Sequence, residues 1–304
     1  MASPIECATL AKGQGDLDKV TLRHASGASA EVYLWGATLT SYKTPDGAEH
    51  IFVSPASPFD GKKAIRGGVP LVFPQFGRPN EAMPQHGFAR TSLWRVIGVA
   101  DTGSCCSVTL GLSSNESSKA VWPHDFALQF TITLEEKSLR LSLQVENTGE
   151  APFNYQALLH TYFKIPDVTK VWLGGLTGRR FIDKVDGGAV KSESESMISI
   201  PKFTDRVYVG TESKPAEVVV SSATNPMGSE RCPDLYSVTC IAKRASEVVP
   251  CDVVAWNPYD TNSPGDLPPP AWVEFVCVEP GVVAEMHELR AKETAEVAQH
   301  IVPA

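Results

Sequence analysis

The sequence predicts a mainly β protein, a large sandwich of many antiparallel strands with few short helices. Apolar and polar residues alternate with a period of two along two adjoining runs, Phe126–Leu134 and Leu139–Val145, as in half-buried strands. Only the four polar residues 135–138 separate these runs, which predicts an antiparallel hairpin. The 304 residues also include 23 prolines and 23 glycines, a content that favours many turns over long helices.

Further strands are expected on both sides of this hairpin. After a turn at residues 147–150 a third run extends over Phe153–Phe163. Helical periodicity is almost absent: the stretch Glu288–Ile301 is rich in Ala, Glu and Lys, but it ends in an alternating pattern, so its end is expected to be a strand. Other short strands are predicted at Glu31–Leu34, Val108–Leu112, Ser237–Ala242, Val253–Trp256 and Trp272–Val278.

Residues 1–304 are expected to form one domain, because large sandwiches reach this length and no repeat of fixed period is visible. Two stretches, Ser221–Asp234 and Pro258–Pro270, have the composition of surface loops rather than of domain linkers. The alternating Ser and Glu residues of 192–196 predict a solvated acidic loop.

Charge and hydropathy restrict the partners. With 27 Lys and Arg against 35 Asp and Glu the net charge is −8, which argues against a general nucleic-acid or anionic-membrane binder but allows a local basic pocket. No apolar run approaches the roughly 20 residues that span a bilayer, and residues 1–20 lack the apolar core of a signal peptide. We therefore expect a soluble, cytoplasmic protein. The oligomeric state does not follow from the sequence, and a monomer is compatible with it.

The cysteines give no sign of a crosslinked or metal-binding framework. Their number is odd, and none of them forms a C-x-x-C pair. We expect reduced and mostly buried thiols, as in cytosolic proteins, at Cys7, Cys105, Cys106, Cys232, Cys240, Cys251 and Cys277.

Several common catalytic motifs are missing from the sequence. There is no G-x-x-x-x-G-K-[ST] phosphate loop and no G-x-S-x-G nucleophile elbow. Gly13-Gln14-Gly15 lacks the third glycine of a dinucleotide-binding turn, and His287-Glu288 has Ala291 where a zincin has its second His. Nucleotide, nicotinamide and zinc-protease chemistry therefore lack their usual sequence support, and no metal is expected.

Two arginine-containing loops are candidates for anion binding. Arg66 precedes two glycines within the Pro-punctuated apolar run 65–78. It could occupy a buried turn in a salt bridge, or its guanidinium could bind a phosphate. In the segment 85–90, His86 and Arg90 flank Gly and small residues, as in loops that converge on a ligand, although a lone His is more often structural. Arg66 and Arg90 together would form a cationic pocket that suits the phosphate of a small substrate.

The run Phe153–Phe163 has a polar face. Its Asn154, Gln156, His160 and Tyr162 share that face, broken by Leu158. These side chains suit a sugar, which needs several hydrogen-bonding groups and an aromatic ring. An ordinary solvent-facing strand is equally compatible with the pattern.

A carboxylate follows the most apolar of the predicted strands. Residues 275–278 are apolar on both faces, which predicts a central, covered strand. Glu279 lies at the expected end of that strand, before Pro280-Gly281, where partial desolvation would raise its pKa and suit it to act as a base. The alternatives are a loop glutamate in water, and Glu274 as the functional carboxylate.

In this order, these clusters resemble the galactose-mutarotase-like superfamily, and within it most of all the glucose-6-phosphate 1-epimerase family. The similarity extends from about residue 20 to about residue 301. Five segments carry it: Arg66-Gly67-Gly68-Val69-Pro70 through Phe76-Gly77, His86-Gly87-Phe88-Ala89-Arg90, Leu159-His160-Thr161-Tyr162-Phe163, Thr204-Asp205-Arg206-Val207-Tyr208 and Cys277-Val278-Glu279-Pro280-Gly281.

The resemblance implies a β-supersandwich and the cofactor-free interconversion of the anomers of a hexose 6-phosphate. It implies that His160 is the general acid and Glu279 the general base. Asp205 would hold a sugar hydroxyl or support the acid. The remaining substrate contacts would come from Arg66, Arg90 and Gln85 at the phosphate, and from His86 at the sugar.

Two other functions are compatible with the sequence. One is an aldose 1-epimerase that acts on unphosphorylated sugars. The other is a carbohydrate-binding or sugar-sensing protein without catalysis. The joint presence of His160 and Glu279 favours an enzyme, because a binding module needs no acid–base pair.

Overall fold

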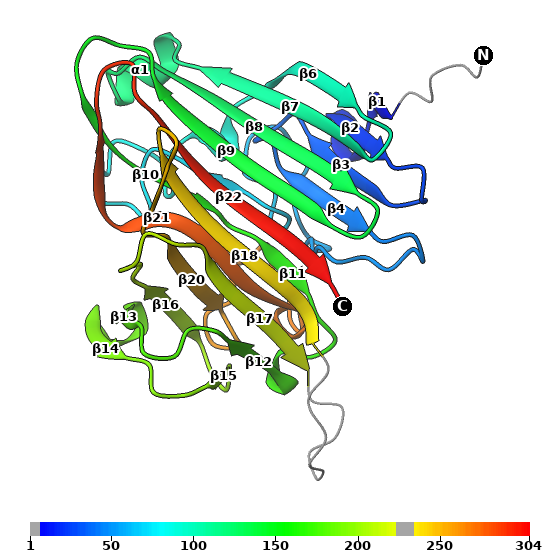
Figure 1. Cartoon of the computed structure of the whole chain (residues 1–304), viewed down its shortest axis with the longest axis vertical. Helices are drawn as coiled ribbons and strands as arrows, with labels where there is room; N and C mark the ends of the chain where they lie inside the picture. The colour runs from blue at the N-terminus through cyan, green and yellow to red at the C-terminus, as the bar shows by residue number, and fades with distance from the viewer. Residues whose placement is uncertain (1–6, 223–233) are drawn as a thin grey trace.

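Three antiparallel sheets are formed by residues 7–222 and 234–304, which are the residues that the computed structural model describes. The smallest sheet, drawn in blue in Figure 1, contains four strands in chain order. They are β1 (Ala8–Lys12), β2 (Asp18–Arg23), β3 (Ser29–Tyr33) and β4 (Leu39–Lys43).

The largest sheet has ten strands. Their order is β15-β12-β17-β18-β22-β9-β8-β7-β6, and β19 pairs with β18. In chain order the strands are β6 (Arg95–Asp101), β7 (Cys105–Ser113), β8 (Phe126–Glu135), β9 (Leu139–Asn147), β12 (Val171–Gly174), β15 (Met197–Ser199), β17 (Ala216–Ser222), β18 (Asp234–Arg244), β19 (Glu247–Val249) and β22 (Thr294–Pro303).

The third sheet has eight strands and carries two of the candidate site residues, Asp205 and Glu279. Its order is β14-β13-β16-β20-β21-β10-β5, and β11 also pairs with β21. Its strands are β5 (Leu71–Val72), β10 (Phe153–Leu159), β11 (Tyr162–Lys164), β13 (Arg180–Asp183), β14 (Ala189–Ser192), β16 (Thr204–Tyr208), β20 (Asp252–Asn257) and β21 (Phe275–Leu289).

Helical structure is scarce among the described residues, as the sequence predicts. The α-helix α1 (Glu116–Val121) begins at a capping box in which Asn115 and Ser118 exchange hydrogen bonds. No helix in this part of the chain has the length and apolarity needed to cross a membrane. The 3₁₀ turns are Gln14–Asp16, Ala89–Thr91, Val168–Lys170, Lys184–Asp186 and Ala271–Glu274.

The predicted hairpin is confirmed as β8 and β9, which pair from Phe126 with Asn147 to Leu134 with Leu139. Along both strands the apolar residues are buried and the intervening residues face outward, as the period of two requires. The other predicted short strands lie within or over β3, β7, β18, β20 and β21, and the alternating end of Glu288–Ile301 lies in β22.

The buried face of the ten-stranded sheet packs on the eight-stranded sheet. Val297 and Ile301 of β22 share one core with Val276 and Val278 of β21, and all four are almost inaccessible to solvent. Burying each such side chain stabilises the fold by about 1.5–3 kcal/mol. Figure 1 shows β22 and β18 running across β21. The site is therefore built on a sheet whose other face is held by a second sheet.

The structure corrects the predictions at strand ends. The third run is two strands, β10 and β11, interrupted at His160-Thr161. The predicted strand 272–278 begins only at Phe275, because residues 271–274 form a 3₁₀ turn. Ser221, Ser222 and Asp234 belong to strands rather than to a loop, and residues 223–233 lie outside the described residues. Residues 258–270 contain no strand, as predicted.

Two further predictions are wrong. Cys7 and Cys106 are not reduced thiols: they form a disulfide with a Cα–Cα distance of 5.9 Å, in a place where both residues are buried. An odd cysteine count excludes pairing of all the cysteines, but not of two of them. The loop 192–196 is not fully solvated, because Glu193 is buried and accepts a hydrogen bond of 2.8 Å from the hydroxyl of Tyr208.

Candidate functional site

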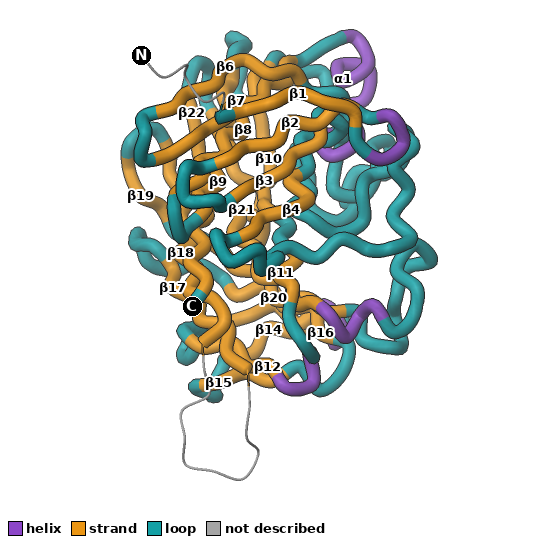
Figure 2. The backbone as a smooth tube through the Cα atoms, turned by 90° about the vertical axis from the view of Figure 1, so that its right-hand side faces the viewer, coloured by secondary structure: helices purple, strands orange, loops and turns teal. Residues whose placement is uncertain are grey.

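A cavity of about 270 Å³ brings together the side chains that the sequence analysis selected. Most of its lining residues lie outside the strands, and Figure 2 shows that loops gather along one side of the sheets. All seven selected residues line the cavity: Arg66, Gln85, His86, Arg90, His160, Asp205 and Glu279.

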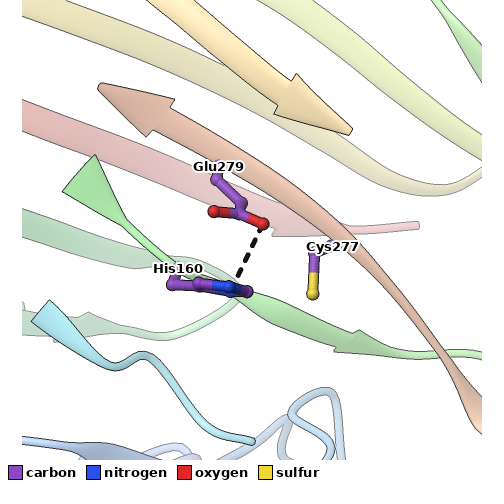
Figure 3. Close-up of side chains that lie close together, drawn as sticks. All are labelled: His160, Cys277 and Glu279. Atoms are coloured by element: carbon purple, nitrogen blue, oxygen red, sulfur yellow. Dashed lines mark ion pairs between the residues drawn. The ribbon is translucent and has the colours of Figure 1, made fainter. Parts of the chain in front are cut away.

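His160 and Glu279 face each other in the lining of this cavity. His160 lies in the break between β10 and β11, and Glu279 lies in β21. The Nδ1 atom of His160 is 3.3 Å from Oε1 of Glu279, and the side chains point toward one another (Figure 3). Only 8% of His160 and 1% of Glu279 are exposed. An imidazole and a carboxyl group therefore meet in a site from which most water is excluded.

The sequence analysis predicted that Glu279 lies at the end of its strand. This prediction is wrong, because β21 continues to Leu289. β11 pairs with β21 up to Cys277, and β10 resumes the pairing at Gly281. Pro280, which has no N–H to donate, thus occupies a stretch of β21 without a ladder partner from β10 or β11. The Pro-Gly pair marks an interruption in the sheet, not its edge.

Burial shifts both members of the pair toward their uncharged forms. It lowers the pKa of His160 well below its usual value, and Arg90 and Arg66 lower it further by repulsion. Burial also raises the pKa of Glu279 well above that of an ordinary carboxyl group, and Asp205 adds to this effect. Apart from their 3.3 Å contact with each other, Nδ1 of His160 and both carboxyl oxygens of Glu279 have no hydrogen-bond partner among the described residues. Such groups are available to a ligand in the cavity.

Arg66 forms a salt bridge, which is one of the two alternatives of the sequence analysis, and phosphate binding by Arg66 stays a prediction. Its Nε donates to Oδ1 of Asp266 at 2.9 Å, which is a salt bridge, and its Nη1 is 3.4 Å from the hydroxyl of Tyr162. It also lines the cavity. The glycines after it are required by the backbone: at Gly68 (φ 74°) a Cβ would lie 2.3 Å from the carbonyl oxygen of Leu39. A residue with a Cβ therefore does not fit at position 68, two residues after Arg66.

Arg90 supplies a positive charge that has no salt-bridge partner among the residues that the structure describes. It lies in the 3₁₀ turn 89–91, and its Nη2 donates to the backbone oxygen of Gln85 at 2.7 Å. Burial, followed by repulsion from Arg66, lowers the pKa of Arg90 to about 10, so it is still charged at neutral pH. An anion between Arg66 and Arg90 would remove this repulsion.

His86 is held in a strained conformation. Its φ of 65° is in the left-handed region, which is costly for a residue other than glycine. Its Nδ1 accepts a hydrogen bond of 3.2 Å from the N–H of Gly77, which leaves Nε2 as the ring nitrogen that can donate. The ring lies 5.8 Å from that of His160 and perpendicular to it. In this tautomer Nε2 is a hydrogen-bond donor of a side chain that lines the cavity.

Asp205 and Lys184 stand at a second charged region of the cavity. Asp205 in β16 has a raised pKa because it is buried, and Lys184 opposes that shift. The sequence analysis missed Lys184, whose Nζ lies 4.3 Å from the centre of the Phe76 ring. No local pattern marks it, because it enters the site from the turn after β13. Phe76 and Trp256, which also line the cavity, provide apolar faces of the kind that pack against sugar rings.

Among the described residues one group of possible metal ligands is found, and two of its three members line the cavity. His160, Cys277 and Glu279 are buried, and their donor atoms lie within 4.8 Å of one another (Figure 3). Nitrogen, sulfur and carboxylate oxygen are the donors that zinc prefers. However, Arg66 and Arg90 line the same cavity, and their positive charge opposes a cation there. The charges of this site favour an anionic ligand.

Comparisons with known proteins agree with the sequence resemblance. Residues 18–227, more than half of the chain, match the aldose 1-epimerase family. A protein of Escherichia coli K12, named as a candidate glucose-6-phosphate 1-epimerase, is 31% identical over 289 residues, which cover 94% of this chain and 90% of that protein. A protein of Cenchrus ciliaris with the same name is 31% identical over 300 residues, covering 95% of this chain and 86% of the other.

Solved structures share the fold. The crystal structure of a candidate mutarotase from Salmonella typhimurium superposes with a TM-score of 0.83 at 28% identity, covering 100% of this chain and 96% of that chain. The galactose 1-epimerase of Lactobacillus acidophilus NCFM superposes with a TM-score of 0.72 at 15% identity, covering 97% and 98%. The latter similarity concerns the fold alone.

Proposed function

The chain belongs to the aldose 1-epimerase family and is a mutarotase, and we propose that its substrate is glucose 6-phosphate, whose α and β anomers it interconverts. One observation carries the choice of substrate. The cavity that contains the acid–base pair also contains Arg90, a half-buried cation without a salt-bridge partner among the described residues. A neutral sugar would leave that charge unpaired, whereas a phosphate would neutralise it.

The proposed mechanism uses only side chains that line the cavity. Glu279 takes the proton of the C1 hydroxyl while His160 donates a proton to the ring oxygen. The C1–O5 bond breaks and the open-chain aldehyde forms. Rotation about the C1–C2 bond presents the other face of the carbonyl, and closure with the proton transfers reversed gives the other anomer. Asp205 and His86 are assigned to sugar hydroxyls, and Gln85 assists the arginines at the phosphate.

The number of protons that His160 and Glu279 hold together agrees with this mechanism. Ring opening requires that the pair hold one proton, because one group gives a proton and the other takes one. In the empty site burial favours neutral His160 and protonated Glu279. A phosphate beside Arg66 and Arg90 would offset the two charges that lower the pKa of His160, which favours moving the proton to the imidazole. The phosphorylated substrate thereby favours the acid form of His160.

A comparison of two substrates tests the proposal. Freshly dissolved α-anomers of glucose 6-phosphate and of glucose are each followed by polarimetry with and without the protein. We expect kcat/KM to be at least tenfold higher for glucose 6-phosphate, since a charge-assisted hydrogen bond contributes about 1.5–3 kcal/mol. Equal or higher values for glucose would instead identify an epimerase of unphosphorylated sugars. The cytoplasmic location, which was expected from the sequence, stays a prediction.

A further inference from the structure

A buried glutamine of the opposite sheet connects to both sides of the acid–base pair. Gln299 lies in β22, and its Oε1 accepts a hydrogen bond of 2.6 Å from the hydroxyl of Thr161. Its Nε2 donates to the backbone oxygen of Val278 at 3.0 Å. Both Gln299 and Thr161 are at least 99% buried. We call these two hydrogen bonds the Gln299 bridge.

The bridge contacts the residues directly beside the acid and the base. Thr161 follows His160, and Val278 precedes Glu279. Residues 160 and 161 are not paired with a neighbouring strand of the eight-stranded sheet, because β10 ends at Leu159 and β11 begins at Tyr162. The N–H of Thr161 bonds to the nearby oxygen of Leu159, which makes a tight local turn. The strand ladder therefore does not link His160 to the strand that carries Glu279.

Gln299 can connect the segment of His160 to the strand of Glu279, because its own backbone is paired with a strand on each side. It pairs with Cys240 of β18 and with Leu141 of β9, so β22 is an interior strand of the ten-stranded sheet. The orientation of the amide is determined by its partners: a carbonyl oxygen only accepts, so the NH₂ group must face Val278, and the hydroxyl of Thr161 donates to the amide oxygen. The side chain of Gln299 thus connects both segments, at Thr161 and at Val278, to the interior strand β22.

From this geometry we infer that Gln299 is a positioning residue, which holds His160 and Glu279 at the separation needed to act on the two oxygens of one sugar ring. The inference rests on the proposed function, because it assumes that these two groups are the acid and the base. It needs no contact between Gln299 and the sugar. Displacing a reacting group by about 1 Å can cost about 10²-fold in rate.

The test compares variants that keep the shape of the bridge but remove its hydrogen bonds. Gln299→Leu and Thr161→Val are expected to lower kcat for glucose 6-phosphate by about 10- to 100-fold. KM should stay within about threefold, because the arginines that bind the phosphate do not touch the bridge. Thr161→Ser keeps the hydroxyl and is expected to restore most of kcat. Anomer exchange measured by NMR magnetisation transfer gives these rates.

A second buried amide provides the matched control. Asn147 is fully buried at the end of β9, in the same sheet as Gln299, and its Nδ2 donates to the backbone oxygen of Leu289 at 3.0 Å. Leu289 is the last residue of β21, far along that strand from Glu279. Asn147→Leu is expected to lower the free energy of unfolding as much as Gln299→Leu does, yet to leave kcat near that of the wild type.

The Gln299→Glu variant distinguishes positioning from general destabilisation. A protonated carboxyl group can accept from Thr161 and donate to Val278, but a carboxylate cannot donate. The ratio of its kcat to that of the wild type should therefore rise as the pH falls. The titratable groups next to the bridge in sequence or register, His160, Glu279, Cys277 and Cys240, are present in both proteins, so dividing by the wild-type kcat removes the pH dependence that the two proteins share.

Three outcomes would overturn the inference: equal kcat values for Gln299→Leu and Asn147→Leu, a loss that appears in KM alone, or a Gln299→Glu ratio that does not depend on pH. The proposed substrate can fail separately. If the wild type acts on glucose and not on glucose 6-phosphate, the substrate assignment is wrong, and the same variants assayed on glucose still decide whether Gln299 positions the pair.

Discussion

Glu279→Gln is expected to lower kcat for the anomer interconversion of glucose 6-phosphate by about 10²–10⁴-fold, the usual contribution of a general base. The same change is expected to make the protein more stable at neutral pH. The carboxyl group is 1% exposed, and apart from the 3.3 Å contact with His160 neither oxygen has a hydrogen-bond partner among the described residues. An amide of nearly equal shape cannot ionise there. The variant thus loses activity without losing its fold.

The pH dependence of this stability effect follows from the direction of the pKa shift. Burial raises the pKa of Glu279 above its unfolded value. The group therefore contributes stability that is fully present below the unfolded pKa and is lost as the pH rises through the folded pKa. We expect Glu279→Gln to raise the free energy of unfolding by about 1–3 kcal/mol at pH 7. The gain should shrink as the pH falls toward 4.5.

Urea unfolding at several pH values measures this difference. Glu274→Gln is the control, because Glu274 is the other carboxylate of the same segment and lies exposed in the 3₁₀ turn before β21. It should change neither rate nor stability. A Glu279→Gln variant with near-normal kcat would remove Glu279 from the mechanism, whatever its stability.

Arg90→Ala is expected to lower kcat/KM for glucose 6-phosphate by about 10- to 100-fold, because it removes a charge-assisted contact worth about 1.5–3 kcal/mol. Its effect on free glucose should be small, since glucose carries no phosphate. The remaining arginine is already paired with Asp266 at 2.9 Å, so it cannot replace the lost charge in full. Steady-state rates on both sugars measure the change in specificity.

The exposed Arg95 at the start of β6 serves as the control for a loss of positive charge. Arg95→Ala should leave both substrates unaffected. An equal loss on both sugars in Arg90→Ala would show that Arg90 supports the structure of the site and does not recognise phosphate.

The sequence predicted those parts of the structure that depend on local periodicity. The alternation over 126–145 identifies β8 and β9, and the apolar residues 275–278 identify a central strand. It did not predict the break at His160-Thr161, because a period of two says nothing about where a ladder is interrupted. For the same reason Pro280-Gly281 indicated the end of a strand that continues to Leu289.

Contacts between distant segments could not be read from the sequence. Asp266, which pairs with Arg66, comes from the Pro-rich loop 258–270, and Lys184 comes from a turn without a distinctive motif. The disulfide joins Cys7 to Cys106, across 99 positions. By contrast, the seven selected site residues do share one cavity. They were found through five motifs in a fixed order, which carry more information than any single spacing.

A crystal structure of the Glu279→Gln variant with glucose 6-phosphate tests the central claim most directly, because the inactive variant keeps the ligand in place. We expect the phosphate within hydrogen-bond distance of Arg66 and Arg90, the C1 hydroxyl beside the side chain at position 279, and the ring oxygen beside His160. A phosphate bound away from both arginines, or a sugar ring out of reach of His160 and position 279, would contradict the account.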